Sequence, residues 1–101
     1  MARVVKKFIP EAPVTRGGSW NGGFNISGTL LQVIVQPTNT DTIYNVGIKD
    51  EDGMLIYVRY DVKGNLVDDG LGIVIMPGEK RLILEDVTKD EPFRIKLIYQ
   101  L

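Results

Sequence analysis

Acidic side chains cluster in the middle of the chain, and carboxylates can bind metal ions or transfer protons. Residues 50–52, Asp-Glu-Asp, are followed by Gly53 and resemble the start of a calcium-binding loop. The EF-hand pattern places its glycine sixth and a glutamate twelfth, whereas here the glycine is fourth and Asp61 is twelfth. Because Asp and Gly also favour β-turns, we interpret the stretch as a turn, with a calcium site as the alternative.

A second candidate is the pair Asp68 and Asp69, because two carboxylates can act as general acid and general base across a cleft. Neighbouring residues of a strand point to opposite faces, so this pair does not make such a site by itself. The chain has no cysteine and no histidine, which removes zinc–thiolate sites and most nucleophile–base pairs. We therefore expect no catalytic residue, no cofactor, no metal and no enzymatic activity.

Length and charge set further limits. A chain of 101 residues, 44% hydrophobic and 25% charged, is expected to form one globular domain. Its net charge of −1 gives no field that would attract nucleic acid or an anionic membrane. No apolar run has the length of a membrane span, and the first residues lack the apolar region of a signal peptide. We expect a protein made in a cytoplasm that binds neither nucleic acid nor membrane.

The secondary structure of the chain is predicted to be β-strands. No window repeats apolar residues at helical spacing, whereas β-branched and aromatic residues recur between turn clusters. Turns are expected at residues 37–41, 50–53, 61–65, 69–70 and 77–78, the last four as hairpin loops. Strands are expected at residues 4–9, 24–36 (which can break at Gly28), 43–49, 54–61, 71–76, 80–85 and 93–100. This spacing predicts an all-β fold, an antiparallel immunoglobulin-like or jelly-roll-like sandwich with an extended N-terminal arm.

A change in composition divides the chain into the arm, residues 1–23, and a β-sandwich body, residues 24–101. The arm holds four basic residues against one acidic residue, whereas residues 50–69 hold six acidic residues against two basic ones. Glycine-rich arms are usually disordered unless something packs on them. We expect residues 4–9 to add a strand to the sheet edge of a partner and the basic side chains to meet an acidic surface.

Trp20, the only tryptophan, lies in the segment RGGSWNGGFNISG, which holds five of the eleven glycines. Three interpretations stay open. The indole can fill the core of its own body, anchor a protein interface, as tryptophan often does, or stack on a sugar ring with help from Tyr44, Tyr57, Tyr60 and Tyr99. The partner-binding residues expected from the arm and its junction are Arg3, Lys6, Lys7, Phe8, Arg16, Trp20 and Phe24.

Together these features resemble the small accessory proteins of tailed-bacteriophage virions, of the capsid decoration or cement type. The segments that carry the likeness are VVKKFIPEAPVTRGGSW, TLLQVIVQPTNTDTIYNVGIKDEDG and MPGEKRLILEDVTKDEPFRIKLIYQL, the last of which resembles the final hairpin of an immunoglobulin-like domain. The resemblance implies a non-enzymatic structural protein of a virion that decorates or cements a capsid through its arm and sheet edges. The partners it implies are the major capsid protein or other virion subunits, and further copies of this chain in a homo-oligomer. The alternative is a carbohydrate-binding β-sandwich module that uses Trp20 and exposed tyrosines.

Overall fold

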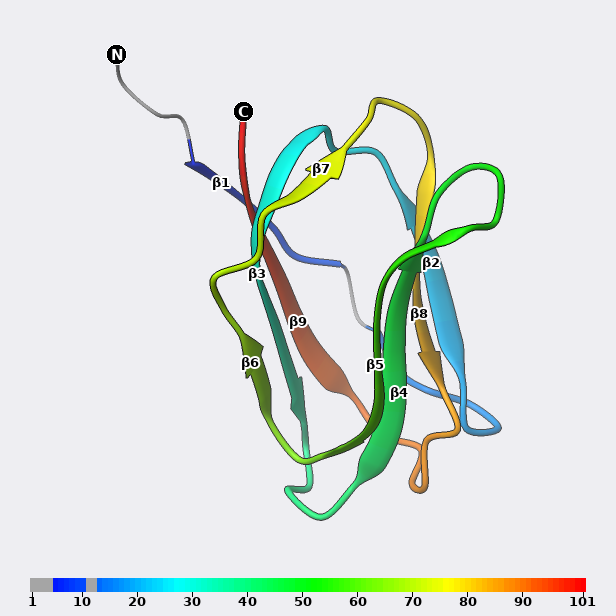
Figure 1. Ribbon diagram of the computed structural model, residues 1–101. Coiled ribbons are helices and arrows are strands. Elements are labelled where there is room, and N and C mark those ends of the chain that lie inside the picture. The colour runs from blue at the N-terminus through cyan, green and yellow to red at the C-terminus, as the bar shows by residue number, and fades with distance from the viewer. Residues whose placement is uncertain (1–4, 11–12) are drawn as a thin grey trace.

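Two antiparallel β-sheets make up the computed structural model of this protein, which describes residues 5–10 and 13–101 (Figure 1). The strands are β1 (Val5–Phe8), β2 (Trp20–Phe24), β3 (Gly28–Pro37), β4 (Ile43–Lys49), β5 (Leu55–Lys63), β6 (Leu66–Asp68), β7 (Ile73–Ile75), β8 (Lys80–Glu85) and β9 (Phe93–Gln100). One sheet has the order β1-β9-β3-β6, with β7 also pairing with β3, and the other has the order β2-β8-β4-β5. The described residues contain no helix long and apolar enough to cross a membrane.

The strand order is that of a jelly roll. β1 pairs with β9, β2 with β8 and β4 with β5, while β6 and β7 together act as one interrupted strand beside β3. This is the pattern of one long hairpin rolled up so that its strand pairs alternate between two sheets. The expected all-β antiparallel sandwich is confirmed, and the jelly-roll alternative describes its topology. The expected final hairpin is wrong, because β8 and β9 lie in different sheets.

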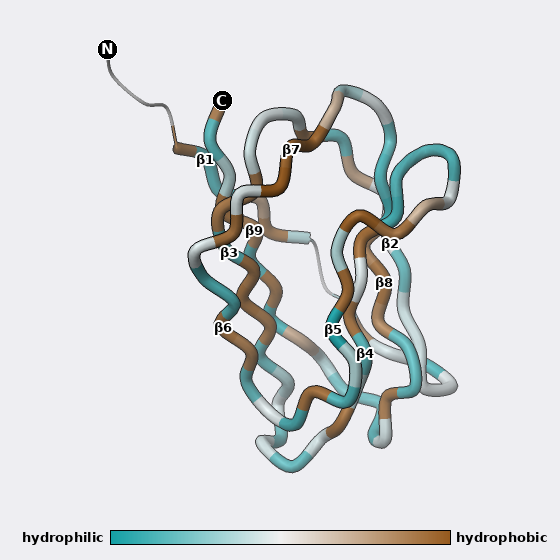
Figure 2. The backbone as a smooth tube through the Cα atoms, viewed as in Figure 1, coloured by the Kyte–Doolittle hydropathy of each residue, from teal (hydrophilic) through white to brown (hydrophobic). Residues whose placement is uncertain are grey.

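The hydrophobic core fills the space between the two sheets. Tyr44, Leu82 and Leu97, from β4, β8 and β9, are each at most 1% exposed. The Tyr44 ring meets Phe93 edge-on, with the ring centres 5.1 Å apart. From Phe93 to Leu97 of β9, hydrophobic and hydrophilic residues alternate (Figure 2), so that one face of the strand lies in the core. Each large side chain buried here contributes about 2 kcal/mol, so the core supplies most of the stability.

The predicted strands at residues 43–49, 80–85 and 93–100 coincide with β4, β8 and β9, whereas the middle of the chain differs. The expected hairpin at 61–65 is a crossing, because β5 continues to Lys63 and the chain then enters the other sheet. The loop at 69–70 joins β6 to β7, which follow each other along β3, and the turn at 77–78 also joins two sheets. A turn signal marks a change of direction but not the sheet that the next strand enters.

Residues of the predicted arm contribute strands to both sheets. Phe8 on β1 is paired with Leu97 on β9, and Trp20 on β2 with Leu84 on β8, so the expected boundary between residues 23 and 24 falls inside β2. We expected residues 4–9 to extend a partner's sheet, but Val5–Phe8 extends the chain's own sheet, and Val4 lies outside the described residues. A free edge in the same chain is favoured because pairing with it costs no translational freedom.

The glycine-rich segment before Trp20 is held against the loop between β8 and β9. The N–H groups of Gly17 and Gly18 each donate to the Asp90 carboxylate at 2.8 Å, and both glycines have positive φ angles, 61° and 77°. The Gly18 carbonyl accepts from the Val87 N–H at 3.0 Å. These bonds fix the path of the chain into β2 and hence the position of Trp20.

Glu91 is a buried side chain that joins three segments of the chain. Its carboxylate accepts hydrogen bonds from the Asn39 N–H, the Asn39 side-chain amide and the Thr42 hydroxyl. Its main-chain N–H donates to the hydroxyl of Thr15, which precedes β2. Burial alone would raise the pKa of Glu91, but the hydrogen bonds stabilise the carboxylate and bring its pKa below the ordinary value of 4.5.

We expect the protein to lose stability as the pH falls below about 4.5. The pKa of Asp90 is also lowered, chiefly by the hydrogen bond from the Gly18 N–H. A carboxyl group with a lowered folded pKa contributes stability above its unfolded pKa and loses it as the pH falls through the folded pKa. Chemical denaturation of wild type and Glu91→Gln should therefore show a stability difference that is largest at neutral pH and shrinks in acid. A difference that stays constant across this range would contradict the assignment.

Candidate functional site

An open apolar groove lies where the outer strands of the two sheets meet, between β1 and β2. Its volume is about 440 Å³, and among the described residues both strands are the last in their sheets. Of the described residues that line it, none is charged and only Trp20 has a polar side-chain atom: Phe8, Ile9, Pro10, Trp20, Gly22, Gly23, Phe24 and Leu82. Edge strands present main-chain N–H and C=O groups that pair with no other strand. We call this feature the β1–β2 groove.

The Trp20 indole lies over the backbone of Gly22. Trp20, Gly22 and Phe24 alternate along β2 and share the face that is directed at the core. A methyl group on Gly22 would lie only 2.7 Å from the Cη2 and Cζ2 atoms of the indole. The absence of a side chain at Gly22 therefore allows the ring to lie against the strand, where it packs on the core and stays partly exposed to the groove.

Phe8 and Phe24 close the groove toward the core. Their rings are stacked with the ring centres 5.1 Å apart and an angle of 27° between the planes. Phe24 is buried, whereas Phe8 is partly exposed. Aromatic pairs of this kind contribute about 1 kcal/mol beyond the area they bury, so the stack helps to hold the edge strands of the two sheets together.

The groove brings together the three aromatic residues predicted to bind a partner, but not the four basic ones. Lys6 and Lys7 are exposed on β1 and do not line the groove. Arg16 is exposed in the turn that it forms with Ser19. Arg3 lies outside the described residues. Positive charge is therefore found beside the groove, on β1, and not within it.

Sequence reasoning missed the role of Gly22 and of the lining residues Ile9, Pro10 and Leu82. For Gly22 a signal existed, because it follows Trp20 by two positions and residues two apart on a strand share a face. For the others no local signal exists, because they enter the groove only through the topology that places β1, β2 and β8 together.

The acidic run at residues 50–53 forms the turn of the β4–β5 hairpin, as expected. One oxygen of the Asp50 carboxylate accepts the N–H groups of Asp52 and Met54, each at 2.9 Å, and Gly53 has a φ of 81°. This carboxylate oxygen thus stabilises the turn. Within residues 5–10 and 13–101, no group of three or more acidic side chains is placed to hold a metal ion.

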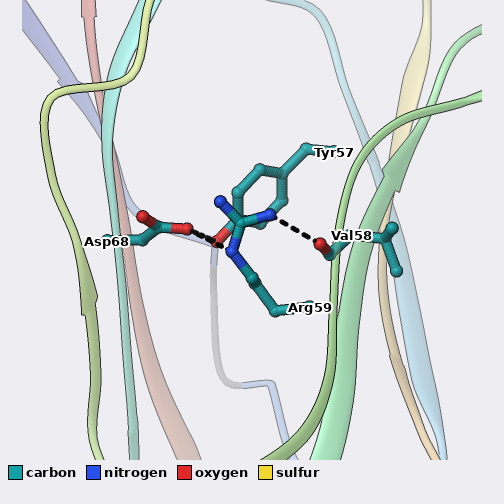
Figure 3. Close-up of polar contacts among 4 residues, drawn as sticks. All are labelled: Tyr57, Val58, Arg59 and Asp68. Carbon is teal, nitrogen blue, oxygen red and sulfur yellow. Dashed lines mark hydrogen bonds and ion pairs between the residues drawn. The ribbon is translucent and has the colours of Figure 1, made fainter.

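A second polar cluster ties β5 to β6 on the side of the sandwich opposite the groove (Figure 3). Asp68 accepts from the Tyr57 hydroxyl at 2.8 Å and pairs with Arg59 Nε at 2.7 Å, and the guanidinium lies 4.9 Å from the Tyr57 ring centre. Burial raises the pKa of Tyr57, and its hydrogen bond to Asp68 raises it further. Because β5 and β6 belong to different sheets, these three side chains act as a structural link.

The tyrosines do not gather around Trp20, and no tyrosine lines the groove. Tyr44 and Tyr57 are buried in the core. Tyr60 is 65% exposed but lies on β5, at the other edge of the sheet from β2. Tyr99 is partly buried on β9 and packs against the core. A sugar platform made of Trp20 and neighbouring tyrosines is therefore not formed by these residues.

Comparisons with known proteins find similar structures but no similar sequence. No protein-family model matches the chain, and no curated protein sequence matches it significantly. One similar solved structure is "Carbohydrate-Binding Module CBM36 in complex with calcium and xylotriose", with a TM-score of 0.44, 16% identity and 100% of each chain covered. Two others are chains of infectious bursal disease virus: the Gt strain (TM-score 0.42, 9% identity, covering 99% of this chain and 30% of that one) and the Gx strain (TM-score 0.39, 10% identity, covering 99% and 32%). What this chain binds must follow from the chemistry of the groove.

Proposed function

We propose that this protein is a non-enzymatic binding protein that holds an extended segment of another protein in the β1–β2 groove. The observation that carries the proposal is that the described side chains lining the groove are apolar except for one indole N–H, and that β1 and β2 beside it pair on one side only within the described part of the chain. An extended polypeptide can pair its main chain with such an edge and place alternate side chains in the groove. Trp20 then acts as the central aromatic anchor, a role in which tryptophan is enriched.

The same lining argues against the carbohydrate-binding alternative. A sugar ring can stack on Trp20, but its hydroxyl groups need hydrogen-bonding partners, and a buried polar group without one costs about 1–3 kcal/mol. Among the described side chains of the groove only the indole N–H can supply one, and the main-chain groups of the strand edges have the spacing of an extended polypeptide. Jelly rolls occur in both viral capsid and lectin domains, so the fold itself favours neither function.

The finer part of the proposal concerns the partner. In keeping with the resemblance to virion accessory proteins, we take the bound segment to belong to the major capsid protein or another virion subunit, which places the protein in a virion. Lys6 and Lys7 are exposed on β1 beside the groove, so a segment with acidic flanks is favoured electrostatically.

Because Trp20 is the only tryptophan, its fluorescence reports on the groove directly. We expect peptides with alternating apolar residues and acidic flanks to change this fluorescence, and xylotriose, used as an oligosaccharide probe, to leave it unchanged. Gly22→Ala should weaken peptide binding, because the new methyl group displaces the indole. The matched control is Gly72→Ala, outside the groove, where a methyl group would meet nothing within 4 Å, and binding should persist.

Trp20→Ala removes the anchor and should weaken peptide binding by about thirtyfold, the equivalent of about 2 kcal/mol at an interface hot spot. Isothermal titration can measure this loss where the fluorescent reporter is gone. Xylotriose binding that disappears in Trp20→Ala, with no peptide bound by wild type, would instead support the carbohydrate alternative.

A further inference from the structure

The outer face of the sheet β2-β8-β4-β5, directed away from the core, has an apolar centre. Gly47 on β4 is paired with Val58 on β5 and Ile83 on β8, and all three lie on this face. Leu55, 48% exposed, and Tyr60, 65% exposed, extend the apolar area along β5. A methyl group on Gly47 would lie 3.3 Å from the Leu55 Cδ2 atom and 3.7 Å from the Val58 Cγ2 atom, so these two side chains close over Gly47 and make the centre of the face apolar.

Charge on this face is separated along the strands. β8 directs Arg81, Ile83 and Glu85 outward in turn, so one strand carries a basic, an apolar and an acidic side chain in a row. The register places Lys49 beside Arg81 at one end and Asn45 beside Glu85 at the other. Arg81 and Glu85 are separated by about 13 Å along the strand, four residues at the usual rise.

The charged ends of this face are not neutralised within the described part of the chain. Among the described residues, the ion pair is that of Arg59 with Asp68, which does not lie on this outer face. Arg81 donates a hydrogen bond to the neutral side chain of Asn21 at 2.7 Å, and Glu85 is exposed. Each end is therefore free to meet an opposite charge.

We propose that this face binds the same face of a second copy of the chain, in a dimer whose two-fold axis runs across the strands at Ile83. Such an axis reverses the strand direction, so Arg81 of each copy faces Glu85 of the other, and Lys49 adds positive charge beside this contact. The Ile83, Val58 and Leu55 side chains of the two copies then pack together in the centre. Sheets packed face to face lie about 10 Å apart, a distance that these side chains fill.

The argument for a second copy is that the face is complementary to itself. A two-fold interface requires that residue i contact residue j and that j contact i, and Arg81 and Glu85 satisfy this on one strand with an apolar residue between them. A partner of a single charge would match one end of this face and be repelled by the other. The proposal uses a different surface from the β1–β2 groove and does not depend on the proposed function.

Charge reversal followed by mixing tests the arrangement. Sedimentation equilibrium of wild type should give a dimer that weakens as salt is added. Arg81→Glu makes the ends of the face acidic and Glu85→Arg makes them basic, so each variant alone should dimerise at least about tenfold more weakly. An equimolar mixture of the two variants should recover the dimer, because each acidic side chain then faces a basic one. Lys96→Glu, an equal charge reversal on the exposed face of β9, is the matched control and should dimerise like wild type.

A wild-type chain that stays monomeric, or a dimer that both reversals leave intact, would overturn the proposal, as would a mixture that does not recover the dimer. Thermal unfolding of each variant shows whether the fold is kept, and all three substituted positions are at the surface. Peptide binding followed by Trp20 fluorescence should be the same in the dimeric and monomeric forms. If peptide binds but no dimer forms, only the dimer proposal fails. If the dimer forms but no peptide binds, only the proposed function fails.

Discussion

Replacing Glu91 with alanine should lower the free energy of unfolding by about 3 kcal/mol, since removing one partner of a buried charged network leaves donors without acceptors. The lost carboxylate accepts three hydrogen bonds, from the Asn39 N–H, the Asn39 amide and the Thr42 hydroxyl. Thr42 is 1% exposed, so water cannot readily take over the role of acceptor. Urea denaturation at neutral pH measures the loss.

The control for this variant is Glu51→Ala, which removes the same group from the exposed turn between β4 and β5. We expect this change to stay within about 0.5 kcal/mol of wild type, as is usual for surface substitutions. The main-chain hydrogen bond from Glu91 to Thr15, before β2, is kept in Glu91→Ala, so the loss comes from the side-chain bonds to the loop between β3 and β4. Equal effects of the two substitutions would show that the Glu91 network contributes nothing specific.

Gly64→Ala should lower the free energy of unfolding by about 3 kcal/mol or more, because it combines backbone strain with a collision against fixed main-chain atoms. Gly64 has a φ of 70°, a region that other residues rarely adopt. A methyl group there would lie 2.5 Å from the Thr40 carbonyl oxygen. Gly64 cannot move away easily, because its N–H donates to the Thr42 carbonyl and its own carbonyl accepts from the Tyr44 hydroxyl.

Gly70→Ala separates strain from collision. Gly70 has a φ of 69°, matching that of Gly64, but a methyl group there would meet nothing within 4 Å. We expect this variant to lose about 1 kcal/mol, the cost of the left-handed conformation alone. Chemical denaturation of both variants gives the difference that is due to contact with Thr40. Equal losses in the free energy of unfolding for Gly64→Ala and Gly70→Ala would show that the chain relaxes around residue 64. The close contact with Thr40 would then not restrict this position.

The sequence predicts best the strands that have clear turn residues at both ends and alternating side chains along their length. The bounds of β4, β8 and β9 follow from alternation and turn residues alone. β6 was missed because its three residues, Leu66–Asp68, follow a turn that resembles a hairpin loop but carries the chain into the other sheet. In β3 the pairing shifts between Leu30 and Gln32, so that Leu30 and Val33, three residues apart, are both buried, and a bulge of this kind depends on the neighbouring strand.

The candidate site, like the fold, could be predicted only in part from the sequence. Composition identifies Phe8, Trp20 and Phe24 as unusual residues of the N-terminal segment, but only the jelly-roll pairing makes β1 and β2 neighbours and creates a groove. The role of Glu91 was not predicted, because in the sequence it lies in a charged loop where exposure is the rule. Its burial results from hydrogen bonds to Asn39 and Thr42, far away in the chain.

Nuclear magnetic resonance of the full chain, titrated with an apolar peptide that has acidic flanks, shows whether the β1–β2 groove is the binding site. The single indole N–H resonance belongs to Trp20. Our account predicts that it shifts together with the backbone amides of β1 and β2, while those of β5 and β6, at the opposite edges of the sheets, stay in place. Shifts confined to β5 and β6, or no shift with peptide and a clear shift with xylotriose, would contradict it.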